Sequence, residues 1–92
     1  MRERDIEQSF CRKLQKRGCL TPKISDNPGW PDRLVIAPGG KHCFIEFKRP
    51  GGKLSPIQIA ITSQIAELGH TVFVIDSCTD IGVDEVMKSI QD

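Results

Sequence analysis

The sequence of 92 residues predicts an α/β fold, in which helices flank a mixed β-sheet. Two apolar runs on either side of a Pro-Gly-Gly turn predict a β-hairpin over residues 33–48. A helical segment and a short β-branched run follow, and the order strand, helix, strand is typical of a parallel pair with a crossover. A chain of this length supports one hydrophobic core, so we expect residues 1–92 to form a single domain.

Residues 3–17 are predicted to form the first helix, which ends at Gly18. Its apolar residues recur at helical spacing: Ile6, Phe10, Cys11 and Leu14. Glu7 lies at the edge of this stripe. It is either a solvated glutamate or a group that reaches a site on the sheet below. Residues 20–24 are predicted to be a short edge strand, because Pro22 lacks the N–H that an inner strand needs.

Ser55 and Pro56 are suited to begin a second helix, which we expect to continue to residue 68. Its many isoleucines predict that it is well buried, and Gln58 is the polar exception in its first turn. Gln58 is either exposed or directed toward a site. Residues 71–76 are predicted to be a buried strand and residues 80–90 a last helix, so the expected order is α-β-β-β-α-β-α.

The charge of the chain is unevenly distributed, although its formal net charge is only +1. Residues 1–53 contain twelve Lys and Arg against six Asp and Glu, whereas residues 54–92 contain one against six. A basic half that also contains carboxylates suits a phosphate-rich substrate, or is ordinary surface charge. The four cysteines show no zinc-binding spacing and are expected to be reduced thiols. We see no signal peptide or membrane-spanning run, and expect a cytoplasmic protein without a membrane partner.

Two carboxylates and an amine are brought together by the predicted hairpin. Glu46 and Lys48 alternate with Phe47 along a strand, so their side chains share one face. Pairing of the two strands brings Asp32 near Glu46. Mg²⁺ and Mn²⁺ prefer oxygen ligands, so Asp32, Glu46 and the Phe47 carbonyl are predicted metal ligands, and Lys48 is suited to stabilise charge on a phosphate. Pro-Asp or Glu-x-Lys alone is a weak signal, but the ordered combination is much stronger.

The motifs Pro31-Asp32 and Glu46-x-Lys48 resemble those of the PD-(D/E)xK nuclease superfamily. The fuller pattern resembles its VRR-NUC branch, the virus-type replication-repair nucleases, in three stretches: Gly29-x-Pro31-Asp32, Ile45-Glu46-Phe47-Lys48 and Leu54-Ser55-Pro56-x-Gln58. The resemblance implies a restriction-endonuclease-like core and an endonuclease that hydrolyses phosphodiester bonds with Mg²⁺ or Mn²⁺ and no small-molecule cofactor. It covers most of the chain, from Glu7 to about Asp76.

The same resemblance implies a role for each matching residue. Asp32 and Glu46 become metal ligands and Lys48 the catalytic lysine. Glu7 becomes the acid of the first helix, either as a second-site ligand or through a water, and Gln58 the glutamine of the second helix. Stand-alone members occur in phages and bacteria, and their associations include dimerisation and cleavage of branched DNA such as Holliday junctions. We therefore expect a homodimer in a bacterial or phage-infected cell. The strongly apolar second helix and the acidic last helix are the candidate interfaces.

Basic residues near the motifs are the candidates for DNA contact. Arg49 and Lys53 flank a Gly-Gly pair that lets backbone amides approach phosphate, and Arg33 and Lys41 belong to the hairpin. Three alternatives remain open. The chain could be a nuclease without junction selectivity, a non-catalytic nucleic-acid-binding module, or a small interaction domain in which Glu46 and Lys48 form only a surface salt bridge.

Overall fold

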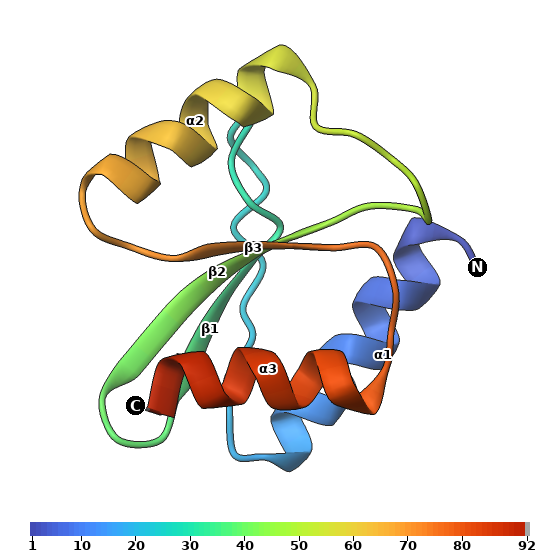
Figure 1. Cartoon of the computed structure of the whole chain (residues 1–92), viewed down its shortest axis with the longest axis vertical. Coiled ribbons are helices and arrows are strands. Elements are labelled where there is room, and N and C mark those ends of the chain that lie inside the picture. The colour runs from blue at the N-terminus through green and yellow to red at the C-terminus, as the bar shows by residue number, and fades with distance from the viewer. Residues whose placement is uncertain (92) are drawn as a thin grey trace.

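The computed structural model describes residues 1–91, in which three helices pack around a three-stranded sheet (Figure 1). The elements in chain order are α1 (Glu3–Lys16), β1 (Arg33–Ala37), β2 (Lys41–Phe47), α2 (Pro56–Glu67), β3 (Val72–Ile75) and α3 (Asp80–Gln91). The central strand β2 is antiparallel to β1 and parallel to β3. The predicted α/β fold with a mixed sheet is confirmed. None of the helices described is long and apolar enough to cross a membrane.

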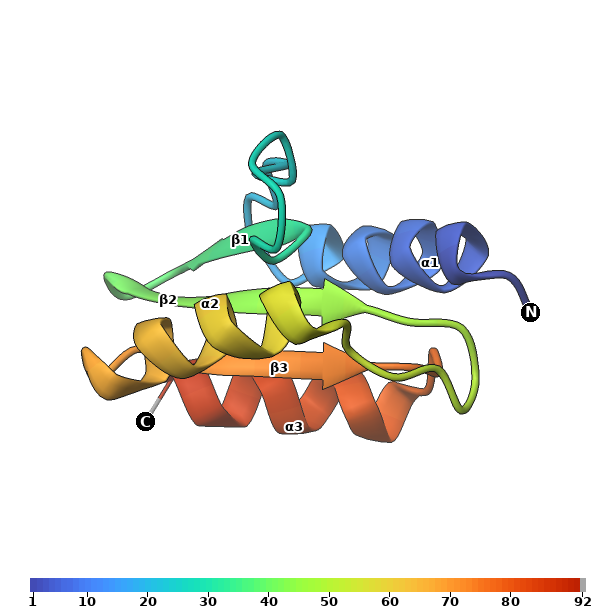
Figure 2. The same cartoon turned by 90° about the horizontal axis from the view of Figure 1, so that it is seen from above.

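The helices cover the two faces of the sheet unequally. Helices α1 and α3 lie on one face and pack against β1 and β2, whereas α2 lies alone on the other face, over β3 (Figure 2). The main core lies between the sheet and the α1–α3 pair, where the Phe10 and Phe47 rings meet edge to face at 5.8 Å. All four cysteines are free thiols. Burial raises the pKa of Cys43 to about 12, so this thiol stays protonated at neutral pH.

Alternation along β2 separates its core residues from its site residues. Cys43, Ile45 and Phe47 are buried among α1 and α3 in the main core. Because side chains alternate along a strand, Phe44 and Glu46 point to the opposite face, on which α2 lies. The fold therefore places Glu46 between the sheet and the first turn of α2.

The strand expected at residues 20–24 is reduced to two isolated bridges, Leu20 with Ile36 and Lys23 with Arg33. The Pro22 carbonyl accepts a hydrogen bond from the Leu34 amide at 3.1 Å, but Pro22 has no N–H to donate in return. The described order of elements is therefore α-β-β-α-β-α. The segment follows the edge of β1 without forming a continuous strand.

The prediction that α2 is well buried is wrong. Ile65 is its only buried residue, whereas Ile57 and Ile59 are 50% and 52% exposed and Leu68, directly after the helix, is 78% exposed. The helix is exposed because, in the described chain, the sheet has only one layer, α2 itself, on this side. Within residues 1–91 no element lies beyond α2, so only the side of the helix that faces the sheet is covered. A helix that is apolar around its whole circumference is normally covered on all sides.

Candidate metal centre and active site

The hairpin places Asp32 next to Glu46. Arg33 pairs with Ile45 in the antiparallel register, so Asp32, one residue earlier, lies opposite Glu46. One carboxylate oxygen of Asp32, Oδ2, accepts a hydrogen bond from the Phe47 amide at 2.8 Å. This bond fixes Asp32 at the end of the sheet and leaves its second oxygen free to face Glu46. The N–H and C=O of one residue point to the same side of a strand, so the Phe47 carbonyl is also directed toward Asp32.

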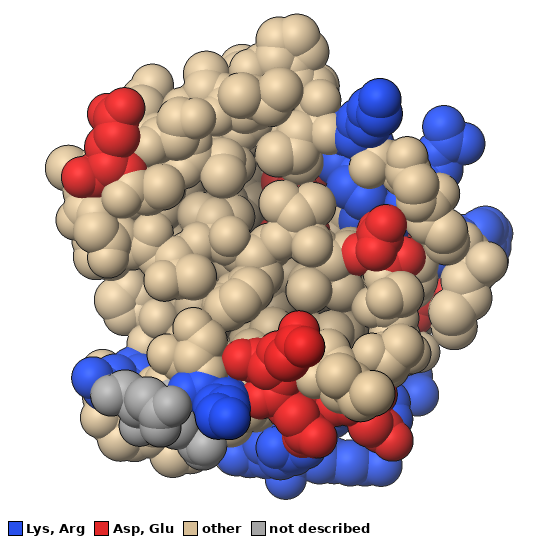
Figure 3. Space-filling model, viewed as in Figure 1, with Lys and Arg blue, Asp and Glu red and all other residues tan. Residues whose placement is uncertain are grey.

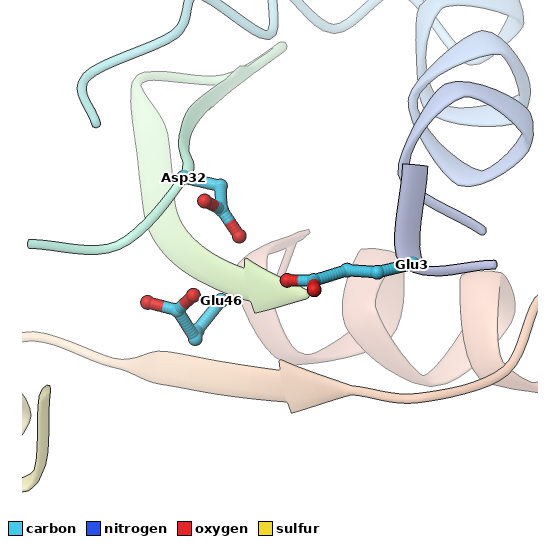
Figure 4. Close-up of side chains that lie close together, drawn as sticks. All are labelled: Glu3, Asp32 and Glu46. Carbon is cyan, nitrogen blue, oxygen red and sulfur yellow. The ribbon is translucent and has the colours of Figure 1, made fainter. Parts of the chain in front are cut away.

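A third carboxylate, that of Glu3, joins this pair from the first turn of α1 (Figure 4). Glu3, Asp32 and Glu46 each offer one oxygen, and these three oxygens lie within 4.8 Å of one another. The sequence pattern favours Glu7 as the acid of the first helix, but the structure places Glu3 in this cluster. The two glutamates are four residues apart and share a face of the helix, so the helical phase alone would also have indicated Glu3.

Glu7 is occupied by an ion pair outside the cluster. Its Oε2 accepts a hydrogen bond from Arg33 Nε at 2.7 Å, and Arg33 Nη1 donates to the Thr21 carbonyl at 2.7 Å. Both charged side chains are largely buried. The guanidinium of Arg33 thus joins α1 to the start of β1 through contacts within the protein. This placement favours a structural role for Arg33 over the DNA contact expected from the sequence.

Gln58 connects α2 to the candidate site. Its Oε1 accepts a hydrogen bond from the Ser55 amide at 2.9 Å, and the Ser55 hydroxyl accepts one from the Gln58 amide at 3.3 Å. This reciprocal pair is a capping box that fixes the start of the helix. Gln58 Nε2 lies 3.5 Å from Glu46 Oε1, at the limit of a hydrogen bond. The same side chain therefore caps the helix and faces the carboxylate.

The Glu46 carboxyl is buried, and one of its two oxygens has no hydrogen-bond partner among the described residues. The residue is 1% exposed, and the oxygen without a partner in residues 1–91 is Oε2. Burial raises the pKa of Glu46 to about 8, the nearby Asp32 carboxyl contributes to this rise, and Lys48 opposes it. A buried carboxylate oxygen without a partner is costly, and a divalent cation would satisfy it. The three carboxylates fit a hard cation that takes oxygen ligands, and Glu46 Oε2 is the oxygen that still lacks a partner in the described chain.

Lys48 lies directly after β2 and two residues after Glu46. Its amide donates to the Ile75 carbonyl at 2.9 Å, which continues the pairing with β3 and fixes the backbone at this point. The side chain is half-buried. The ammonium is close enough to Glu46 to lower the pKa of that carboxyl.

The basic connection between β2 and α2 lies beside this centre. Arg49 and Lys53 are exposed, and Figure 3 shows Lys and Arg side chains gathered at the upper right, where this connection runs. The connection is anchored at Gly51, whose amide donates to Asp76 Oδ2 at 3.3 Å. Lys41, by contrast, begins β2 and lies at the opposite end of the strand, about 20 Å from Phe47 at the rise of roughly 3.3 Å per residue.

Comparisons with known proteins found two similar chains. A solved structure described as a VRR_NUC domain has a TM-score of 0.80 and 29% sequence identity to the chain, with 94% of each chain covered. A protein of Acyrthosiphon pisum secondary endosymbiont phage 1, named "Putative nuclease p44", is 39% identical over 79 residues, which are 84% of this chain and 85% of that protein. No family model matches the chain.

A mixed sheet flanked by helices, with acidic residues and a lysine at the end of its central strand, defines a nuclease with the restriction-endonuclease-like fold. The relative and the solved structure narrow this class further. The chain belongs to the VRR-NUC family and is an endonuclease. The resemblance of the Pro-Asp and Glu-x-Lys motifs to this family is thereby confirmed, whereas the roles of the individual residues stay predictions.

Proposed function

We propose that the chain is a divalent-metal-dependent endodeoxyribonuclease in which Asp32, Glu46 and the Phe47 carbonyl hold Mg²⁺ or Mn²⁺. The observation that carries this proposal is the buried Oε2 of Glu46, which lacks a partner although two other carboxylates lie beside it. Three carboxylates that converge without a cation repel one another. A metal ion would remove this repulsion and complete the hydrogen-bonding and charge requirements of Glu46.

A divalent ion at this centre would polarise the phosphate and lower the pKa of a bound water. The protein groups prepare the site for that chemistry. The Phe47 amide fixes Asp32, and Gln58 holds Glu46 from the first turn of α2. Lys48 extends from the end of β2 on the same face as Glu46, where its ammonium is suited to stabilise charge that develops on the phosphate.

In this proposal Glu3 and Glu7 of the first helix have different roles. Glu3 reaches the cluster and adds a third carboxylate, directly or through a water. Glu7 acts as a positioning residue, because its ion pair with Arg33 fixes α1 against β1 and so sets the distance from Glu3 to Asp32. We place the DNA backbone along Arg49 and Lys53, which follow Lys48 directly. Lys41 could meet only a distant part of the substrate.

Cleavage assays with Lys48→Ala test the proposed reaction. The substrates are a labelled four-way junction, a linear duplex and a single strand, each incubated with Mg²⁺, Mn²⁺ or EDTA. We expect cleavage only with metal, and a loss of roughly a hundredfold or more in the variant, because one electrostatic group at the transition state is removed. Lys41→Ala is the matched control: it removes an exposed lysine at the other end of β2, far from the carboxylates, and should keep normal cleavage.

The remaining outcomes separate the competing functions. Cleavage confined to the junction would establish selectivity for branched DNA, and equal cutting of all substrates would give a nuclease without it. Salt-sensitive DNA binding without cleavage in any metal would favour a binding module instead. Equal cleavage in EDTA would contradict the proposed metal centre, and equal cleavage by Lys48→Ala would contradict the proposed role of Lys48.

We further propose that two copies associate through the exposed apolar residues of α2 and its C-terminal end, Ile57, Ile59 and Leu68, together with Val74 of β3. Among Asp, Glu, Lys and Arg, residues 54–75 contain only Glu67, and Figure 3 shows a broad area over α2 and β3 that is largely free of charged groups. A face without cations offers nothing to DNA phosphates. Two copies of this nearly uncharged surface can meet across a two-fold axis without bringing like charges together.

Size also favours self-association. A standard interface takes about 800 Å² from each partner, which is a minor part of the 5670 Å² of accessible surface of this chain. One small domain covers little DNA, and paired cuts on opposite strands of a junction require two sites related by a two-fold axis. Glu46 lies on the side of α2 that faces the sheet, whereas the proposed interface uses residues of α2 that are exposed.

Sedimentation of Ile59→Glu tests the proposed dimer. We expect the unmodified chain to sediment as about twice 10.3 kDa at micromolar concentration, and the variant as a monomer, because a buried charge at the interface has no partner. Ile81→Glu is the control, since Ile81 is 73% exposed on α3, the alternative interface. A monomeric unmodified chain would refute the dimer, and loss of association only in Ile81→Glu would move the interface to α3.

A further inference from the structure

His42 and His70 meet at the end of the sheet opposite to the carboxylates. His42 is the second residue of β2, and His70 lies in the turn between α2 and β3, 28 residues later. Nε2 of His42 is 3.2 Å from Nδ1 of His70. Both imidazoles are exposed, so a solute ion can reach the two facing nitrogens. The cysteine and histidine spacing in the sequence predicts no zinc site, because this pair forms only when β2 and β3 are aligned.

Phe44 fixes the orientation of both rings. Its ring lies edge to face with His42 at a centroid distance of 6.0 Å and with His70 at 6.4 Å. The two imidazole centroids are 5.2 Å apart. Phe44 is half-buried on the α2 side of the sheet and follows His42 on the same face. Phe44 thus packs against both imidazoles on the side of the sheet where their nitrogens meet.

The separation of these nitrogens matches two ligands of one metal ion. Zinc–imidazole bonds of about 2.0–2.1 Å at a tetrahedral angle put the nitrogens roughly 3.3 Å apart. We propose that His42 and His70 form a bidentate site for a borderline transition-metal ion of the class of Zn²⁺ or Ni²⁺. Water molecules complete the coordination, because no third Asp, Glu, Cys or His of the described chain joins the pair in a cluster.

The imidazole site is separate from the carboxylate centre in place and in chemistry. His42 precedes Glu46 by four residues on the same face of β2, about 13 Å away at the usual rise. Imidazole suits Zn²⁺, Ni²⁺ and Co²⁺, whereas carboxylates and water suit Mg²⁺ and Mn²⁺. The site therefore does not depend on the proposed nuclease function. A metal bound there joins the first residues of β2 to the turn before β3 and stabilises the folded chain, because the unfolded chain lacks the preformed pair.

Titration with Ni²⁺ tests this site by calorimetry and thermal unfolding. We expect the unmodified protein to bind about one equivalent with a rise in Tm of roughly 10 °C at a hundredfold excess over the dissociation constant. His42→Ala and His70→Ala should each lose the binding and the rise. The double variant Asp32→Asn with Glu46→Gln, which lacks the carboxylate centre, should keep both. Mg²⁺ should give no signal that depends on either histidine.

The opposite pattern would overturn the proposal. Binding retained by both histidine variants but lost in the carboxylate double variant would assign the metal to the other centre. Absence of Ni²⁺ binding by the unmodified protein would show that His42 and His70 form only a hydrogen bond and no metal site. Because both histidines are exposed, their variants should fold normally, and circular dichroism without metal verifies this before the titration.

Discussion

Replacing Glu46 by glutamine should abolish cleavage and at the same time stabilise the metal-free protein. The change removes a proposed metal ligand but keeps the size of a side chain that is 1% exposed. It also removes a buried carboxyl whose pKa burial raises to about 8 from its ordinary value of 4.5. We expect the metal-free variant to gain about 2 kcal/mol at pH 8.5, or roughly 10 °C in Tm.

The pH dependence of this gain follows from proton binding. Between pH 4.5 and about 8 the folded chain holds the Glu46 proton more tightly than the unfolded chain does. The contribution of Glu46 to stability is therefore fully present below about pH 4.5 and is lost as the pH rises through 8. Thermal unfolding of both proteins in EDTA at pH 5.5, 7 and 8.5 should show a difference that grows with pH.

Mg²⁺ provides the matching control. A metal bound to ionised Glu46 should raise the Tm of the unmodified protein at pH 8.5 and leave that of Glu46→Gln nearly unchanged. Asp32→Asn is a useful comparison, because the asparagine oxygen can still accept the Phe47 amide hydrogen bond. A variant Glu46→Gln that unfolds at lower temperature than the unmodified chain, at every pH, would show that the carboxyl is needed for the fold itself.

The part of the site on the hairpin could be predicted from the sequence because it is local. A turn between two short strands fixes their register, and the register brings Asp32 opposite Glu46. The sequence pattern leaves Gln58 either exposed or directed toward a site, the family resemblance implies the site, and in the structure its Nε2 lies 3.5 Å from Glu46 Oε1. In these cases one or two neighbouring elements decide the position of the side chain.

Other features depend on how distant elements pack, and the sequence alone did not resolve them. Glu3 and Glu7 share a face of α1, so the choice between them depends on how far along its axis the helix lies over the sheet, and Glu7 pairs with Arg33. The exposure of α2 depends on the number of layers on its side of the sheet. The two histidines meet only after β2 and β3 pair in parallel. The hydrophobic pattern of a helix shows which of its faces are apolar, but it does not show which other elements pack against those faces.

Replacing Gly29 by alanine should destabilise the protein and weaken the site together. Gly29 has a φ of +84°, where a Cβ is disfavoured. An added Cβ would lie 2.7 Å from Ile57 Cγ1 and 3.0 Å from the Ile57 carbonyl oxygen. The glycine therefore lets the loop before Asp32 approach the first turn of α2. We expect a loss of about 2–3 kcal/mol, because strain and a backbone clash add.

Gly39→Ala separates these two contributions. Gly39 has nearly the same φ, +87°, but no atom lies within 4 Å of its added Cβ. Urea unfolding should therefore show a loss of only about 1 kcal/mol for this variant. Since Gln58 directly follows Ile57, displacement of α2 should also lower cleavage by Gly29→Ala, whereas Gly39→Ala should cleave normally. Equal losses of stability in the two variants would mean that the close approach of Gly29 to α2 does not hold the site together.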